Sequence, residues 1–218
     1  RHRPRAYWTL RIGLAVLAFY AFVAILSVFW TPYDPLTPGI GDGYDAPSLA
    51  FPLGTDRLGA DMLSRLMAGA RYDLGIAAVA VAIALTVGTT IGVLAGYFGG
   101  VLDTAVMRAV EIFQAFPGLL FAMLVVQAVG AGIANVVLVL SFVGIPDYLR
   151  LARAEIRAKR TWQYAEAARL AGNLPWRVAF RHLLPNSIGP LLAFTSINAA
   201  FAALVAAGLG FLGLGLGP

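Results

Sequence analysis

Long apolar stretches constrain the fold of this sequence more than any other feature. Five of them approach or exceed the roughly 20 residues that a helix needs to cross the hydrocarbon core of a membrane. They cover residues 10–30, 74–98, 101–129, 131–149 and 186–209. Charged residues make up only 12% of the chain, about half their share in a typical soluble domain. The sequence therefore predicts an all-α polytopic membrane protein with five spans.

The composition also bears on the kinds of site that the chain can hold. It contains no cysteine, which rules out disulfides, thiolate catalysis and cysteine metal sites. Its two histidines, His2 and His182, lie far apart in the sequence, so we expect no metal centre. A net charge of +5 would suggest nucleic acid in a soluble protein. Here the basic residues flank or connect apolar stretches, which favours contact with lipid head groups and no nucleic-acid partner.

Residues 1–30 combine a short basic head with an apolar run. Secretory signal peptides share this pattern, but the run is longer than their usual apolar region and no small-x-small cleavage site follows it. Trp8 and Trp30 stand near its two ends, where aromatic residues favour the membrane interface. We therefore predict a cytoplasmic N-terminus and an uncleaved first span.

Residues 31–73 differ in kind from the apolar stretches. Prolines and glycines break regular structure there, and acidic residues outnumber basic ones. Within this segment, residues 61–70 place four apolar side chains at helical spacing, namely Leu63, Leu66, Met67 and Ala70. The spacing predicts either a short amphipathic helix at the membrane surface or an ordinary loop helix packed on the spans.

Two features inside the apolar stretches predict local geometry. Gly88, Gly92 and Gly96 recur every four residues, a spacing that lets transmembrane helices approach closely. The same spacing is common by chance in glycine-rich sequence. Pro117 interrupts the third stretch and predicts a kinked helix there.

The distribution of charge predicts the orientation of the chain. With a cytoplasmic N-terminus, residues 31–73 lie outside the cell, the Gly99-Gly100 turn inside, the Gly130 turn outside, and residues 150–185 inside. This last segment, the basic loop, holds half of the chain's 16 lysine and arginine residues. Positive charge thus falls on the cytoplasmic side where it is most concentrated, as membrane topology favours.

The basic loop itself contains signals for two short helices. Thr161 is positioned to cap a helix that runs to about Ala171. Gly172 supplies the left-handed residue that ends it. Pro175 suits the first turn of a second helix, and Pro185 is expected to close that helix.

The basic loop also carries a motif. The pattern resembles the EAA loop of ABC importer permeases, and the residues that match are Glu166, Ala167, Ala168, Gly172, Leu184 and Pro185. The Arg181-His182 pair is similar to the variant of the peptide and nickel subfamily. The likeness covers nearly the whole chain, through Gly54-Thr55-Asp56, Gly59, Asp61, Ser64-Arg65, Gly69-Ala70-Arg71, Gly96-Tyr97, Gly99-Gly100 and Phe211-Leu212-Gly213-Leu214-Gly215. Ala206 and Gly208 depart from it, because the subfamily often has Glu and Ser there.

This resemblance implies the transmembrane domain of a type I ABC importer (MetI-like), with a sixth span expected but absent from this chain, which ends at Pro218. It also implies a multi-pass permease of a bacterial or archaeal inner membrane that moves di- or oligopeptides. The implied partners are a sister permease in a heterodimer, two cytoplasmic ABC ATPases that bind ATP and Mg, and an extracytoplasmic substrate-binding protein. The chain has no GxxxxGK[ST] phosphate loop, so we expect a non-catalytic subunit that binds no cofactor itself.

Three alternatives remain beside this interpretation. The same family includes permeases for nickel chelates and other small ligands. An ATPase-independent channel or carrier would need a polar site in mid-span, whereas most spans here are polar only at their ends. An intramembrane enzyme would need paired catalytic groups, and neither a Ser/His pair, paired Asp nor HExxH is found.

Individual charges also have two interpretations each. Glu166 belongs to the ATPase-docking loop by the resemblance, or forms a solvated helix pair with Arg169. Asp103, Arg108 and Glu111 line the transport pathway, or sit at the membrane interface. The basic run 150–160 is expected mainly to anchor the chain to lipid head groups.

Overall fold

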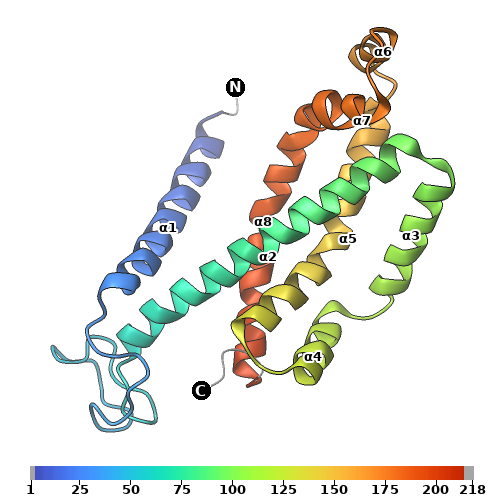
Figure 1. Ribbon diagram of the computed structural model, residues 1–218. Coiled ribbons are helices and arrows are strands. Elements are labelled where there is room, and N and C mark those ends of the chain that lie inside the picture. The colour runs from blue at the N-terminus through green and yellow to red at the C-terminus, as the bar shows by residue number, and fades with distance from the viewer. Residues whose placement is uncertain (1–2, 214–218) are drawn as a thin grey trace. The chain divides into compact units, whose positions relative to one another are not determined.

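The computed structural model describes residues 3–213, and that part of the chain is almost entirely helical (Figure 1). The elements are α1 (Arg3–Phe29), α2 (Met62–Phe98), α3 (Gly100–Gln114), α4 (Gly118–Val129), α5 (Ile133–Lys159), α6 (Gln163–Leu170), α7 (Pro175–Arg177), the π-helical turn η1 (Val178–Leu183), the 3-10 turn η2 (Pro185–Ser187) and α8 (Ile188–Phe211). Leu214, Gly215 and Pro218 of the glycine-rich tail lie outside the described residues. The all-α membrane fold class is confirmed.

Four of these helices are long and apolar enough to cross a membrane, and they are α1, α2, α5 and α8. A fifth span is present if α3 and α4 together make one, with a bend of 79° between them. The break lies at residues 115–117, between the end of α3 at Gln114 and the start of α4 just after Pro117. Proline removes a backbone donor and clashes with the preceding turn, so the kink predicted there is present as a sharp bend.

The chain divides into two compact units, Arg1–Gly75 and Ile76–Pro218. In the first unit, side-chain hydrogen bonds fold the non-helical segment back onto the start of α2. Asp61 Oδ2 accepts the backbone N–H of Ser64 at 2.9 Å, the geometry of a helix N-cap. Ser64 Oγ donates to that carboxylate at 2.6 Å and accepts the N–H of Tyr33 at 3.0 Å.

A second carboxylate organises the turn just before that cap. The N–H of Ala60 donates to Asp56 Oδ1 at 3.0 Å, and the N–H of Leu58 donates to the same oxygen at 2.8 Å. Arg65 forms an ion pair with Asp56. The Ala60 N–H above all, and then Leu58 and Arg65, hold the pKa of Asp56 below its usual value despite opposing desolvation.

The start of α2 corrects one prediction. Residues 61–70 do not form a separate short amphipathic helix, because α2 runs without interruption from Met62 to Phe98 over 37 residues. Its interior contains no proline, and isolated glycines cost a helix only about 1 kcal/mol each. The amphipathic spacing seen in the sequence is therefore the first part of a long spanning helix.

The second unit is built on a close contact between α2 and α5. A Cβ atom added to Gly88 would lie 2.6 Å from the carbonyl oxygen of Ile145, and one added to Gly96 would lie 2.7 Å from that of Arg153. Gly92, between them, faces the carbonyl of Leu149 in the same way. The three glycines thus allow two backbones to meet along more than two turns, so the predicted close approach is confirmed.

Helix α8 completes the core of this unit (Figure 1). Tyr148 of α5 is fully buried, and its hydroxyl donates to Thr195 Oγ1 of α8 at 3.2 Å. Its ring also meets Phe194 edge-on at 5.4 Å between centroids. Buried tyrosine is stable when its hydroxyl finds a partner, so this contact fixes α8 against α5.

Helix α5 extends further than the sequence indicated. The predicted fourth span ended at residue 149, yet the helix continues to Lys159 and takes in the first ten residues of the basic loop. These residues are mostly alanine, arginine, leucine, glutamate and lysine, all strong helix formers. Pro146 lies inside the helix without ending it, which membrane helices tolerate when neighbouring groups satisfy the backbone.

Candidate functional site

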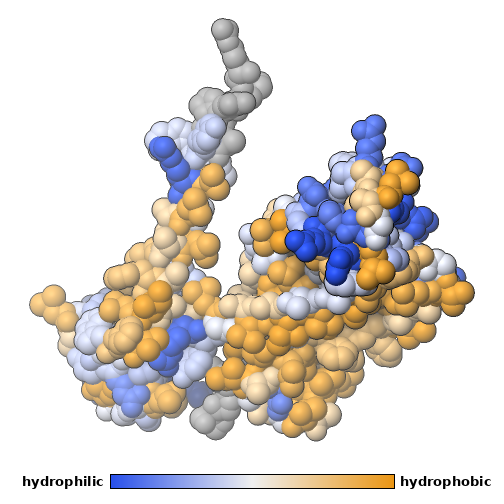
Figure 2. Space-filling view, turned by 45° about the horizontal axis from the view of Figure 1, so that its top comes forward, coloured by the Kyte–Doolittle hydropathy of each residue, from blue (hydrophilic) through white to orange (hydrophobic). Residues whose placement is uncertain are grey.

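The basic loop forms a projecting end of the second unit, with α6 at its tip (Figure 1). Figure 2 shows hydrophilic side chains gathered over this end and apolar surface over the helices below it. Helix α6 begins after Trp162, which makes no side-chain cap bond. Thr161 was predicted to cap this helix, and that prediction is wrong because the cap position lies one residue later.

Helix α6 packs through two of its alanines. Ala165 and Ala168 are buried in the same cluster as Val178, Ala179 and Leu183 of the following turn. Three small or branched side chains on η1 thus pack against the buried face of α6. Ala167 and Glu166 lie on the exposed side of the helix, where another protein surface can reach them.

The end of α6 is a complete Schellman motif. Gly172 has φ +79°, the left-handed conformation that glycine adopts without a steric penalty. Its N–H donates to the carbonyl of Arg169 at 2.9 Å, and the N–H of Asn173 donates to that of Ala168 at 3.2 Å. These two bonds satisfy carbonyls that a helix end otherwise leaves unpaired, so the predicted role of Gly172 is confirmed.

The second half of the loop differs from the prediction. Pro175 does begin a helical segment, but Pro185 does not end it. The chain passes through the π-helical turn η1 and the 3-10 turn η2 directly into α8. Proline needs no N–H donor in the first turn of a helix, which explains why Pro185 can begin η2 after Leu184. The loop is therefore continuous with the last span.

Lys159 connects the two ends of this loop. Its ammonium group donates to Glu155 Oε2 at 2.7 Å, to the carbonyl of Asn186 at 2.9 Å and to Ser187 Oγ at 3.2 Å. The first acceptor lies on α5 and the other two on η2. Because all three ammonium hydrogens have acceptors, the end of α5 is held to the beginning of α8. The lipid anchoring expected of residues 150–160 therefore does not describe Lys159.

Glu166 makes no ion pair in the part of the chain that the structure describes. Arg169, its expected partner, donates to the carbonyl of Arg160 and lies 5.9 Å from the ring centroid of Tyr97. The solvated helix pair proposed from spacing alone is therefore not formed. The carboxylate of Glu166 remains exposed at the tip of the loop.

Large apolar side chains are exposed on the same loop as this carboxylate, and they were not recognised from the sequence. We call them the apolar crest; each is more than half exposed, and they are Trp162, Leu170, Leu174 and Trp176. Leu170 is 84% exposed although it ends a helix with a buried face. Exposed aromatic and aliphatic groups clustered beside a polar rim mark protein–protein contact surfaces. Tryptophan on a loop of short helices is the sequence signal that would have found it.

The three membrane-edge charges separate into two kinds. Asp103 is buried and accepts bonds from Nε and Nη2 of Arg153, the latter at 2.7 Å. Arg157 lies 3.4 Å from the same carboxylate. Arg108 and Glu111 pair with each other at 2.8 Å on the exposed side of α3. The buried pair joins the start of α3 to α5, and whether any of these charges lines a pathway stays a prediction.

We expect the Asp103–Arg153 pair to contribute measurably to stability, and the exposed Arg108–Glu111 pair not to. A double-mutant cycle of Asp103→Ala and Arg153→Ala should give a coupling energy of about 2 kcal/mol, since hydrogen bonds between charged groups are partly shielded from water there. The same cycle on Arg108 and Glu111 should give about 0.5 kcal/mol or less. Thermal unfolding of the purified assembly measures both. Equal coupling in the two cycles would contradict the structural role given to Asp103.

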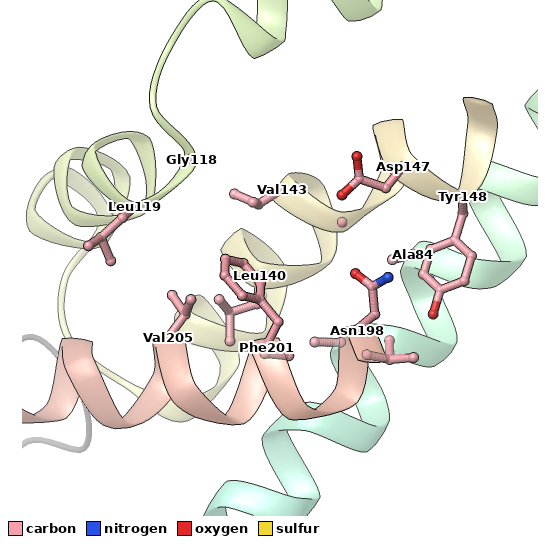
Figure 3. Close-up of a pocket in the computed structure, with 14 residues that line it drawn as sticks. Ala84, Gly118, Leu119, Leu140, Val143, Asp147, Tyr148, Asn198, Phe201 and Val205 are labelled. Carbon is pink, nitrogen blue, oxygen red and sulfur yellow. The ribbon is translucent and has the colours of Figure 1, made fainter. Parts of the chain in front are cut away.

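A small polar site inside the second unit was also missed. A cavity of about 40 Å³ lies between α2, α4, α5 and α8, and Asp147 and Asn198 face it among apolar neighbours (Figure 3). Asp147 lies near the middle of α5, three residues before the charged run that begins at Arg150. It was not singled out from the sequence, and whether it lies in mid-span stays a prediction.

The fold and the loop together define a class of protein: a multi-pass, all-helical integral membrane protein whose spans carry a braced, exposed loop. Comparison with known sequences gives the family. The profile described as binding-protein-dependent transport system inner membrane component matches residues 88–217. The chain belongs to this family of ABC importer permeases.

Three relatives match along almost the whole chain. The dipeptide transport system permease protein DppC of Escherichia coli (strain K12) is 41% identical over 95% of this chain and 71% of its own length. The glutathione transport system permease protein GsiD of Pectobacterium atrosepticum is 37% identical over 98% and 74%. The nickel transport system permease protein NikC of Escherichia coli (strain K12) is 34% identical over 96% and 76%. The family expected from the EAA-like motif is thereby confirmed.

Proposed function

We propose that this chain is the peptide-translocating permease subunit of an ATP-driven importer. Relatives named for dipeptide and glutathione transport support a peptide substrate. The relative named for nickel transport keeps a metal chelate as the second candidate. The permease performs no catalysis in this proposal, and ATP and Mg are bound by separate ATPase subunits.

The observation that carries the proposal is the exposed tip of α6. Glu166 has no partner within the described chain, and the exposed side chains of the apolar crest lie on the same loop. A carboxylate within an exposed apolar surface suits a cleft of a second protein that offers a basic group and apolar walls. We assign that role to one of two ATPase subunits, with Glu166 and Ala167 at the contact and Ala168 buried beneath them in the packed cluster.

The bracing of the loop supports a mechanism for coupling. Lys159 joins the loop to the ends of two spans, α5 and α8. A displacement of α6 by closing ATPases would therefore move both spans together rather than bend a flexible linker. Rocking of rigid helices of this kind alternates access to a site between two sides of a membrane. A sister permease completes the pathway, and an extracytoplasmic binding protein delivers the peptide.

The charge of the loop supports an orientation for the proposed permease. In this proposal the basic end of the second unit lies on the cytoplasmic side of the inner membrane. With α3 and α4 counted as one span, the N-terminus of α1 is cytoplasmic too, and residues 31–61 face the outside.

Reconstitution tests this function. We expect proteoliposomes that contain the permease pair and both ATPases to accumulate a labelled dipeptide only when ATP and the binding protein are supplied. A nickel chelate tested in parallel separates the two substrate candidates. ATPase subunits unable to hydrolyse ATP serve as the control and should show no uptake. Accumulation without ATPase subunits would contradict the proposal and indicate a carrier.

A further inference from the structure

A carboxylate within a candidate membrane span is the starting point. Asp147 lies near the middle of α5, a span with charged residues otherwise only in its last ten residues. Its side chain faces the cavity of about 40 Å³, and Asn198 of α8 faces the same space (Figure 3). Ionisable groups inside a membrane are costly and mark substrate or ion pathways. Asp147 therefore needs a functional explanation.

The hydrogen bonds around Asp147 leave an excess of acceptors. Gln114 Nε2 donates to Asp147 Oδ1 at 3.2 Å, and within the described chain no donor reaches Asp147 Oδ2. Gln114 Oε1 is buried and has no hydrogen-bond partner in that part of the chain. Asn198 Nδ2 donates to the carbonyl of Phe194 at 3.5 Å. Within the described chain no donor reaches the side-chain oxygen of Asn198. The neighbouring Tyr148 hydroxyl donates to Thr195 instead.

This pattern selects the chemistry of the ligand. Two unused oxygens that face the cavity, one on the negatively charged Asp147 and one on Asn198, call for a group that carries several donors and a positive charge, and an alkylammonium group has three donors and no acceptor. A bare metal ion fits less well, because no group of three metal-ligating side chains occurs in residues 3–213. Asp147 also forms no ion pair within those residues, so its charge is not already neutralised.

The size of the cavity limits what enters it. About 40 Å³ accommodates an ammonium head group or a few waters, since one water needs on the order of 10–15 Å³ by this measure. A whole dipeptide is larger. The remainder of a ligand would extend beyond the cavity, away from α5 and α8.

We propose that Asp147 and Asn198 form a subsite for the α-ammonium group of a peptide in transit. This proposal rests on the proposed peptide import and adds a recognition step inside the permease. The charge of Asp147 and the amide oxygen of Asn198 hold the group without enclosing the substrate, as a transport site requires for release. The hydrogen bond from Gln114 positions the carboxylate toward the cavity.

Cysteine labelling tests the subsite without relying on peptide transport. The chain has no native cysteine, so Asn198→Cys can be labelled alone in the reconstituted importer with a trimethylammonium or a sulfonate methanethiosulfonate reagent. The negative charge of Asp147 should raise the ratio of cationic to anionic labelling rates about tenfold, and Asp147→Asn should abolish that preference. Leu138→Cys, on the exposed side of α5, is the control. Its labelling rate should depend neither on the charge of the reagent nor on Asp147→Asn. An unreactive cysteine, or a ratio unaffected by Asp147→Asn, overturns the subsite.

Uptake measurements complete the test. Asp147→Asn retains an acceptor for Gln114 and loses only the charge, so we expect dipeptide uptake to fall about tenfold in kcat while the melting temperature is unchanged. Asp147→Glu should recover most of the rate. If wild type moves no dipeptide, the proposed function fails while the labelling result still stands. If wild type moves dipeptides and Asp147→Asn moves them equally fast, the subsite alone is wrong.

Discussion

Replacing Gly172 by proline is expected to abolish ATP-driven uptake while leaving the chain inserted in the membrane. Proline fixes φ near −65°, whereas Gly172 has φ +79°. It also removes the N–H that donates to Arg169 at 2.9 Å. The end of α6 would unwind and the exposed tip of the loop would lose its shape. Transport assays and membrane fractionation of the same preparation measure both effects.

Two further variants decide whether the shape or the charge of the loop matters. Gly172→Asn should retain at least part of the uptake, because asparagine tolerates the left-handed conformation at a helix end. Glu166→Lys should abolish uptake with α6 intact, since it reverses the charge offered to the ATPase. Asp42→Lys, a charge reversal at an exposed carboxylate outside the basic loop and α3, is the control and should transport normally. Normal uptake by both Gly172→Pro and Glu166→Lys would contradict a docking role for the loop.

Much of the fold could be predicted from local sequence because the constraints were local. Apolar length defined the spans, and Pro117 located the break between α3 and α4. The Gly172-Asn173 pair located the end of α6, since its conformation depends on adjacent residues only. The motif around Glu166 identified the family. Each of these signals acts over a few residues, which is the range in which sequence patterns are reliable.

The parts that were missed depend on contacts between distant residues. Lys159 was assigned to lipid because nothing near it in sequence predicts the acceptors at Asn186 and Ser187. Asp147 was not singled out because the predicted span ended at residue 149, where the composition changes, although the helix does not end there. Asp103 and Arg153 are 50 positions apart. Only the packing of α3 and α8 on α5 brings such groups together.

Helix α5 joins the two proposed sites. Its end at Lys159 is held to η2 at the far end of the basic loop. Asp147 lies twelve residues earlier, roughly 18 Å along the axis of a helix. A continuous helix between the two transmits a displacement at one end to the other. Such transmission requires that α5 keep its position against α2, and the contact at Gly88, Gly92 and Gly96 provides that constraint.

The second large effect is therefore expected at Gly92. A leucine there would place its Cβ against the carbonyl of Leu149, 2.9 Å from Ala152 Cβ and 3.1 Å from the backbone nitrogen of Arg153. Backbone atoms cannot move aside as a flexible side chain can, so α2 and α5 must separate. We expect Gly92→Leu to lower the free energy of unfolding by about 3 kcal/mol, the upper part of the range for overpacked cores. For a chain of this length that corresponds to a fall of about 10 °C in Tm.

A leucine at Gly75 provides the comparison. Gly75 lies on the same helix, and no atom outside the helix backbone and its neighbours is found within 4 Å of an added Cβ. Gly75→Leu should leave Tm unchanged or raise it slightly, because leucine favours a helix over glycine by up to about 1 kcal/mol. Thermal unfolding of the assembled importer compares the two variants. It is monitored by the size-exclusion elution of the assembly in mild detergent. Similar Tm values for Gly92→Leu and Gly75→Leu would mean that α2 and α5 do not meet at this stripe of glycines, and the rigid connection between the basic loop and Asp147 would lose its basis.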